Sequence, residues 1–321
     1  MDNEKQAQEN STQPATMITL AEYAQKDCEK DICAMSTGIK TGFSNLDAHL
    51  SIMPGIYVLG AMPGSGKTTF AQQLGEQIAA SGKPVIYYTL EQRKIDFLLK
   101  SLSRESFVVN PKDAVSAQNL CFGVADNDTY ITERFDDLCK RYTDKELKFY
   151  IMESAFGLNV SALVGNIEQC IKQLSDLPVV VVDYLQIISV DGANTSQRDA
   201  VDRIIEQLKR LQQQYKLTII LISSISRSNY TESLSIDSFK ESGKIEYTAD
   251  VILGMQYSVV HNSRFTNENI SQKRDAIAAE ASKTDRNVEL VCLKNRFGNT
   301  FTCSFTYHCA YNYFEPSNGK F

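Results

Sequence analysis

The chain has 321 residues, of which 43% are hydrophobic, and its formal net charge is −6 with a pI near 5.3. This length suits one large α/β domain with an ordinary buried core. The acidic balance argues against a protein that coats nucleic acid through a broad basic surface, although a narrow track for one strand needs only a few cations per subunit. Because the sequence has neither an apolar run of about eighteen residues nor a secretory signal, we expect a cytoplasmic protein without a membrane span.

The amino-terminal segment differs in composition from the rest. Residues 1–16 are almost wholly polar and cannot bury enough surface to offset the entropy of ordering them, so we expect a disordered tail. Residues 17–37 predict a linker with a short helix that could dock on a neighbouring subunit, since an isolated helix usually packs against something. Residues 38–321 are predicted to form one domain.

Short apolar runs that alternate with helical segments begin at Ile56. The runs cover residues 56–60, 85–89, 147–152, 179–183 and 217–222. They are continuously apolar and rich in β-branched or aromatic residues, as in strands that helices cover on both faces. Two predicted helices have apolar faces, made by Phe70, Leu74 and Ile78 and by Val201, Ile204, Ile205, Leu208 and Leu211. The alternation predicts an α/β fold with a mostly parallel central sheet, whose ligands bind at the carboxyl ends of the strands.

Two stretches interrupt this pattern. Residues 92–146 have mixed helical patterning to which we assign no function. Residues 258–287 are polar with both signs of charge, and they predict a flexible insertion. From Glu289 the sequence alternates apolar and polar residues around a turn at residues 297–299, so we expect C-terminal antiparallel strands that extend the sheet.

The first predicted strand runs directly into a phosphate-binding motif, and a predicted helix follows. The motif comprises Ala61, Met62, Pro63, Gly64, Ser65, Gly66, Lys67, Thr68 and Thr69. Gly64 and Gly66 let backbone N–H groups turn toward phosphate oxygens, and the helix N-terminus adds its dipole. Lys67 would neutralise charge on the β- and γ-phosphates, and Thr68 would ligate Mg²⁺. The motif therefore predicts ATP and Mg²⁺ as cofactors, with Ala61 where the pattern has its first glycine.

Carboxylates follow two of the predicted strands. Asp183 ends the run at 179–183, where an acid on the Mg²⁺ side of the site belongs. An aspartate at a strand end is often only a turn residue, but the phosphate loop upstream favours the metal ligand. Glu91 follows the run at 85–89 at the same sheet edge, where it could polarise a water toward the γ-phosphate. Spacing alone makes Glu91 a surface acid.

Several blocks, in one order over most of residues 38–306, resemble the C-terminal ATPase domain of DnaB-type replicative helicases, within the RecA-like P-loop ATPase class. The blocks are residues 41–47, the phosphate loop, residues 89–91, 183–186, 240–246 with 249–252, and 294–298. The resemblance implies a RecA-like core that hydrolyses ATP, assembles as a hexameric ring and translocates on single-stranded DNA, with a loader or another replication partner.

The resemblance also implies roles for individual residues. Glu91 would be the general base, and Lys294 and Arg296 would reach in trans to the γ-phosphate bound by the adjacent subunit. A loop that follows the DNA strand would include Lys240, Glu241 and Gly243. Without the resemblance, Lys294 and Arg296 are solvated charges at a hairpin end, and the loop is the N-capping turn of a helix.

Two departures from the family pattern leave other functions open. Ser224 stands where the family has a glutamine that senses the γ-phosphate, so the coupling of hydrolysis to DNA is open. Only about thirty-five residues precede the match, so we expect no separate N-terminal domain and an altered or absent primase contact. The alternative to a helicase is a RecA- or KaiC-like regulatory ATPase that oligomerises or binds a protein without unwinding DNA. A small-molecule kinase would leave the block with Arg296 without a purpose.

Overall fold

The computed structural model describes residues 19–26, 28–29, 32, 38–62, 64–153, 158–190, 196–226, 230–239, 243–261 and 269–317. The chain divides into two compact units, Met1–Gly38 and Ile39–Phe321. In the first unit, helix α1 (Leu20–Lys26) lies in the stretch for which a short helix was predicted. The predicted tail at 1–16 lies outside the described residues. No helix in the described ranges is both long and apolar enough to cross a membrane.

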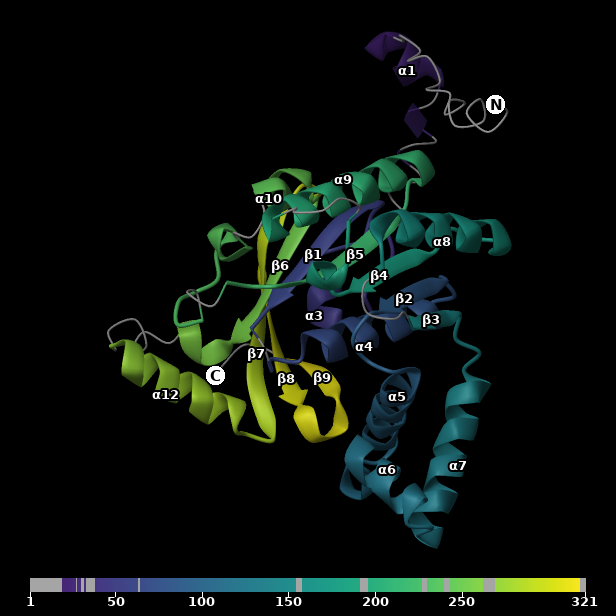
Figure 1. Cartoon of the computed structure of the whole chain (residues 1–321), viewed down its shortest axis with the longest axis vertical. Helices are drawn as coiled ribbons and strands as arrows, with labels where there is room; N and C mark the ends of the chain where they lie inside the picture. Colours follow the sequence, from purple (N-terminus) through teal and green to yellow (C-terminus); the bar gives the residue numbers. More distant parts are fainter. Residues whose placement is uncertain are drawn as a thin grey trace. The chain divides into compact units, whose positions relative to one another are not determined.

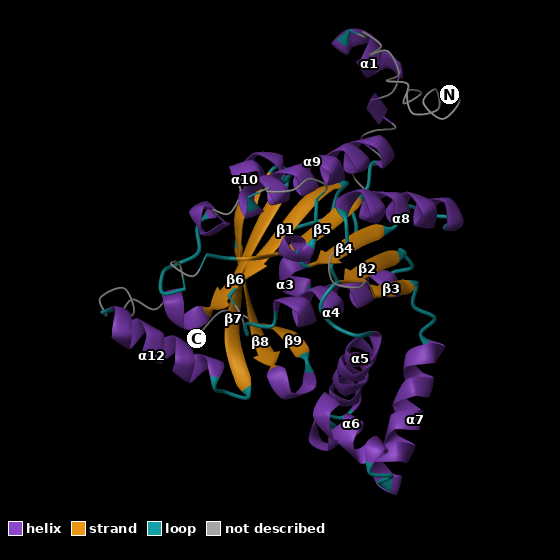
Figure 2. Cartoon of the chain, viewed as in Figure 1, coloured by secondary structure: helices purple, strands orange, loops and turns teal. Residues whose placement is uncertain are grey.

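The described part of the second unit is built on a nine-stranded sheet with the order β3-β2-β4-β5-β1-β6-β7-β8-β9 (Figures 1 and 2). Its strands are β1 (Gly55–Ala61), β2 (Val85–Thr89), β3 (Phe149–Glu153), β4 (Val179–Asp183), β5 (Thr218–Ser224), β6 (Val251–Tyr257), β7 (Asp285–Asn295), β8 (Thr302–His308) and β9 (Tyr313–Ser317). The pairs among β1–β6 are parallel, and β7, β8 and β9 add antiparallel pairs. The predicted fold class is confirmed.

Helices cover both faces of this sheet. Those in the described ranges are α3 (Ser44–Asp47), α4 (Lys67–Ala80), α5 (Lys94–Val109), α6 (Ala117–Ala125), α7 (Thr129–Asp144), α8 (Val160–Gln173), α9 (Gln197–Tyr215), α10 (Gly243–Thr248) and α12 (Ile270–Ala281), with short 3-10 turns at Pro111–Asp113, Leu185–Ile187 (η2), Ile236–Phe239, Ser258–His261 and Cys309–Tyr311. Helices α3 and α4 pack in one core, and α8, α9 and α10 pack in the other.

The parallel strands explain why the sequence runs are continuously apolar. Successive side chains of a strand point to opposite faces, so Val179 and Val181 of β4 lie in the core with α4, while Val180 and Val182 lie in the core with α8 and α9. The predicted apolar faces of both helices are buried against these cores. Both layers therefore follow from the sequence pattern.

The stretch at 92–146 forms a helical group with a small core of its own. Leu102 of α5, Leu120 of α6 and Leu138 of α7 are fully buried in that core. Figure 1 shows the three helices grouped beside α4 and away from α8 and α9. This separate core explains the mixed patterning, because each helix faces its two neighbours rather than the sheet.

The predicted flexible insertion at 258–287 contains helix α12 and the first residues of β7, while residues 262–268 lie outside the described residues. Asn269 and Gln272 form a reciprocal capping box at the start of α12. Lys273 and Glu280 are buried although charged, because Lys273 pairs with Glu232 and the Glu280 carboxylate accepts bonds on its own side of the helix. Ion pairing let a polar sequence form a packed helix, which the composition alone did not reveal.

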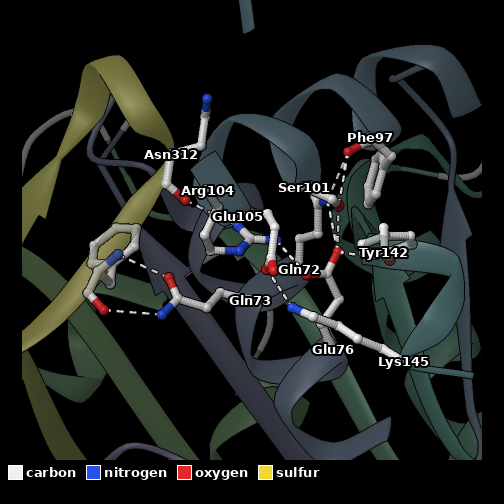
Figure 3. Close-up of polar contacts among 11 residues, drawn as sticks. Gln72, Gln73, Glu76, Phe97, Ser101, Arg104, Glu105, Tyr142, Lys145 and Asn312 are labelled. Atoms are coloured by element: carbon white, nitrogen blue, oxygen red, sulfur yellow. Dashed lines mark hydrogen bonds and ion pairs between the residues drawn. The ribbon is translucent and has the colours of Figure 1, made fainter. Parts of the chain in front are cut away.

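A buried polar network joins α4 to the helical group (Figure 3). The Glu76 carboxylate accepts hydrogen bonds from Arg104 (2.6 Å), Gln72 (3.2 Å) and the Tyr142 hydroxyl (3.3 Å), and a short one from Ser101. An isolated buried charge is costly, but here an opposite charge and three further donors satisfy it. The helix that follows the phosphate loop is thus held rigidly to α5 and α7.

The same helix is also tied to the last strand. The Gln73 amide both donates to the Phe314 carbonyl (2.9 Å) and accepts from the Phe314 N–H (2.8 Å), and Arg104 donates to the Asn312 carbonyl (2.9 Å) (Figure 3). A side chain that replaces a backbone partner in both directions fixes strand and helix together. Strands β8 and β9 therefore pack on α4 as part of one core.

Candidate active site

The phosphate loop connects the end of β1 to the start of α4. Gly64 has φ +79° and Gly66 has φ +91°, which are left-handed conformations that glycine adopts without strain. The Ser65 side chain is buried, and its hydroxyl donates to the Met62 carbonyl at 2.7 Å. Pro63 lies outside the described residues. The chain therefore curls at two glycines immediately before a helix N-terminus, which is the backbone geometry of an anion cradle.

Lys67 is the first residue of α4. Its Nζ lies 4.5 Å from the centroid of the Tyr184 ring, which directly follows Asp183. A cation over an aromatic face is weakly held, so this contact can be exchanged for a phosphate oxygen. Lys67 and β4 are thus brought together as the sequence predicted.

Asp183 is buried at the end of β4. Its Oδ2 accepts a hydrogen bond from the Tyr87 hydroxyl (2.9 Å), whereas its buried Oδ1 has no hydrogen-bond partner among the described residues. Burial raises the pKa of Asp183, and the nearby Thr68 hydroxyl, the Lys67 charge and the Tyr87 hydroxyl oppose that rise. Because a buried polar atom usually has a partner, the unpaired oxygen indicates a position reserved for a ligand.

The donor set beside the loop fits Mg²⁺. The Asp183 carboxylate and the Thr68 hydroxyl are hard oxygen ligands, which Mg²⁺ prefers. Within the described ranges, no cluster of three or more histidine, cysteine or acidic side chains could hold a metal by itself. A Mg²⁺ ion here would take its remaining oxygens from phosphates and water, as is usual for this ion.

Glu91 lies at the same edge of the sheet. Thr89 of β2 pairs with Asp183 of β4, and the Leu90 N–H donates to the Asp183 carbonyl at 2.9 Å. The Thr89 hydroxyl donates to the Gln92 carbonyl at 2.7 Å and so closes the turn that carries Glu91. The exposed Glu91 carboxylate is near enough to contribute to the raised pKa values of Asp183 and Tyr184.

Lys100 of α5 is a further charge at this edge that the sequence analysis missed. Its Nζ donates to the Gln92 side chain at 2.6 Å, next to Glu91. Burial lowers the pKa of Lys100, and the charges of Asp183, Asp96 and Glu91 act in the opposite direction. The available signal was a lone lysine after the apolar run Phe97-Leu98-Leu99, since a cation among core positions needs an acidic neighbour.

Lys294 and Arg296 lie at the opposite edge of the sheet. Asn295 pairs with Val251, and Val251 pairs with Tyr57 near the start of β1. From Tyr57 to Ala61 the strand covers roughly 13 Å at about 3.3 Å per residue, and the phosphate loop begins only there. The structure therefore does not bring these two cations together with Lys67 and Asp183 of the same chain.

The contacts of these cations are local. Arg296 pairs with the Asp250 carboxylate (2.9 Å) and donates to the Tyr247 carbonyl (2.6 Å), and Lys294 donates to the Glu246 carbonyl. Asp250 also accepts from Lys209 Nζ and from the Ile56 N–H, each at 2.8 Å. Burial acts to raise the pKa of Asp250, but these partners outweigh it and hold that pKa below its usual value.

Of the predicted DNA loop, Lys240 and Glu241 lie outside the described residues. Gly243 begins α10, and a Cβ placed there would lie 3.5 Å from the Arg198 guanidinium of α9. Ser224 ends β5, where its N–H donates to Gln186 of η2 at 3.4 Å, and Gln186 donates to the Ser223 hydroxyl at 2.9 Å. An amide side chain therefore does reach the end of β5, although it comes from η2.

Comparison with known proteins gives one family. The domain family described as "DnaB-like helicase C terminal domain" matches residues 38–316. Among similar curated sequences are the replicative DNA helicases DnaB of Pasteurella multocida (27% identical, over 74% of this chain and 50% of that protein), Helicobacter pylori (25%, 94% and 63%) and Geobacillus stearothermophilus (26%, 89% and 58%). The chain thus spans less than two thirds of the length of these relatives.

Two solved structures are similar in fold. One, whose title describes it as an ATPase domain, has a TM-score of 0.75 and covers 94% of this chain and 100% of its own. The other, a DnaB-like replicative helicase whose title includes its interactions with primase, has a TM-score of 0.73 and covers 94% and 67%. Both are 20% identical to this chain, and they confirm the predicted RecA-like core.

Proposed function

This chain belongs to the family of DnaB-like helicase C-terminal domains, and we propose that it is an ATP-dependent helicase core that translocates on single-stranded DNA as an oligomeric ring. The observation that carries the proposal is the carboxyl edge of the sheet. There, two left-handed glycines, a lysine and a buried aspartate with one free oxygen converge within one chain. These are the elements of a Mg²⁺-nucleotide site.

In this proposal, the loop from Gly64 to Lys67 holds the phosphates of ATP, while Thr68 and Asp183 hold Mg²⁺. The bound ion would neutralise charge on the phosphates. Lys67 leaves the Tyr184 ring to pair with a phosphate oxygen. The Glu91 carboxylate accepts a proton from the attacking water, a role for which its exposed place beside Asp183 is suited.

The ring follows from the two edges of the sheet. Arg296 is too far from the phosphate loop of its own chain to act there, so a catalytic Arg296 requires a second copy whose loop faces it. A closed ring gives every loop such a partner, and we propose six subunits in the cytoplasm. Single-stranded DNA would contact the segment that ends at Gly243, and a loader would place the ring on DNA.

Ser224 favours a second candidate, a regulatory ATPase that assembles or binds a protein without unwinding DNA. Steady-state ATP hydrolysis with and without single-stranded DNA separates the two, with Lys67→Ala as the blank. The helicase predicts marked stimulation by DNA, together with unwinding of a forked duplex. Hydrolysis that DNA leaves unchanged, without unwinding, would reject the helicase in favour of the regulatory ATPase.

A further inference from the structure

The carbonyl of Gly64 accepts hydrogen bonds from two side chains that are remote in the sequence. Arg286 Nη1 of β7 donates at 3.0 Å, and the Tyr257 hydroxyl at the end of β6 donates at 3.3 Å. Strands β6 and β7 pair antiparallel, with Tyr257 opposite Val288. Two neighbouring strands thus deliver two donors to one peptide group of the phosphate loop.

Both donors are themselves fixed in place. The Arg286 Nε donates to the Lys283 carbonyl at 3.1 Å, and the guanidinium carbon lies 6.0 Å from the centroid of the Tyr307 ring. Tyr257 is 2% exposed; burial raises the pKa of its hydroxyl, and the neighbouring Arg286 opposes that rise. A neutral phenol at every physiological pH remains a donor.

The two left-handed glycines of the loop are held by different means. A Cβ at Gly66 would come within 2.8 Å of the rings of Tyr307 and Phe314, so close packing fixes the chain there. A Cβ at Gly64 would meet no described atom within 4 Å. Glycine without packing visits many conformations, so the backbone at Gly64 depends on the hydrogen bonds to its carbonyl.

We infer that Arg286 and Tyr257 are positioning residues for the phosphate loop, which they hold at Gly64 in the shape that receives the β-phosphate of a nucleoside di- or triphosphate. The inference rests on the nucleotide site of the proposed function, but not on DNA or on ring assembly. Pre-forming the loop removes an ordering cost from binding, so the two residues strengthen nucleotide affinity. They touch the loop and take no part in proton transfer.

The test measures the affinity of the full chain for ADP by titration with a fluorescent analogue. Arg286→Ala should weaken binding about tenfold, and Tyr257→Phe about threefold, because a charged donor contributes more than a neutral one. Arg286→Lys, which keeps a donor and the charge, should restore part of the loss. Arg286→Gln, which lacks the charge, should fall between lysine and alanine.

Steady-state kinetics distinguishes positioning from general damage. The loop grips the β-phosphate in the ground state and the transition state alike, so Arg286→Ala should raise KM about tenfold with kcat within about threefold of wild type. Arg141→Ala removes a half-exposed arginine that pairs with Asp137 within α7, and it should change neither constant.

Affinities within twofold of wild type in both Arg286→Ala and Tyr257→Phe would overturn the inference, as would a fall in kcat with KM unchanged. If Arg286→Ala does not fold, Arg286→Lys and Tyr257→Phe decide, since both keep the ring packing at Gly66. Hydrolysis that ignores DNA would remove the helicase and leave this inference standing. A wild-type chain that binds ADP no better than Lys67→Ala would overturn both.

Discussion

The two edges of the parallel sheet treat a buried aspartate in opposite ways. At the carboxyl edge, Asp183 keeps one oxygen unpaired, and burial raises its pKa. At the amino edge, Asp250 is bonded to Lys209, Arg296 and a backbone N–H, and its pKa is lowered. A paired acid stabilises the fold, whereas an unpaired one costs stability and remains available to a ligand. Local satisfaction therefore separates the two kinds of acid better than burial does.

The largest effect is expected from the carboxyl edge itself. Lys67→Ala and Glu91→Gln should each lower ATP turnover at least about a hundredfold, since one removes phosphate neutralisation and the other the base. Only Lys67→Ala should also lose nucleotide binding, as a titration with fluorescent ADP would reveal. Lys140→Ala and Glu133→Gln, which change exposed residues of α7, serve as controls. Turnover that persists in Glu91→Gln would remove the base from this edge.

The second prediction asks whether the amino edge belongs to the site of a neighbour. Arg296→Ala should abolish turnover, yet a mixture of Arg296→Ala and Lys67→Ala should recover part of it, because some interfaces then combine an intact loop with an intact arginine. A mixture of Lys67→Ala and Glu91→Gln is the matched control. Those residues share one chain's half of the site, so each interface stays defective. An inactive first mixture of well-assembled variants would reduce Arg296 to a structural ion pair.

The third prediction concerns stability at the amino edge. Asp250→Asn should lower the free energy of unfolding by about 2–3 kcal/mol, because Lys209 and Arg296 lose their shared partner in a largely buried place. Urea denaturation at neutral pH measures this loss. Asp126→Asn, at an exposed position after α6, should be close to neutral. Equal stability of the Asp250 and Asp126 variants would contradict a structural role for the cluster.

The smallest effect carries the sharpest sign. Asp183→Asn should raise the free energy of unfolding of the nucleotide-free chain by about 1 kcal/mol near pH 7, because a buried carboxylate with an unpaired oxygen is removed. The folded pKa of Asp183 is raised, so its destabilising effect is absent below the unfolded pKa near about 3.9 and grows as pH rises through the folded value.

Asp250 gives the opposite pH dependence. Its folded pKa is lowered, so its stabilisation is present above the unfolded pKa and is lost as pH falls through the folded value. Denaturation curves of both variants between about pH 4.5 and 8 would compare the two acids directly. A gain for Asp183→Asn that grows toward low pH would mean that the assignment of the two environments is wrong.

Local patterns accounted for most of the fold and for part of the site. Runs such as Val179–Asp183 show that a strand is buried on both faces and also where it ends, so Asp183 could be predicted from its neighbours. Glu91 followed from the same reasoning once the resemblance was known. The helix α12 was missed because its buried charges are paired with residues that the local sequence does not show.

The missed residues of the site share one property, which is distance along the chain. Arg286 and Tyr257 meet Gly64 across 222 and 193 residues, and a lone arginine in a strand carries no mark of its target. Lys100 lies in an amphipathic helix whose orientation depends on the small core of α5, α6 and α7. Such contacts are fixed by tertiary packing, which periodicity alone does not specify.

The clasp of Gln73 on Phe314 has a consequence for synthesis. Strand β1 and α4 leave the ribosome early, but the rings that press on Gly66 and the bonds that hold Gly64 come from residues 257–314. Domains complete their folding only after such late segments emerge. The nascent chain therefore carries the whole phosphate motif long before it has a rigid phosphate site, and nucleotide binding can begin only when translation of the domain is nearly finished.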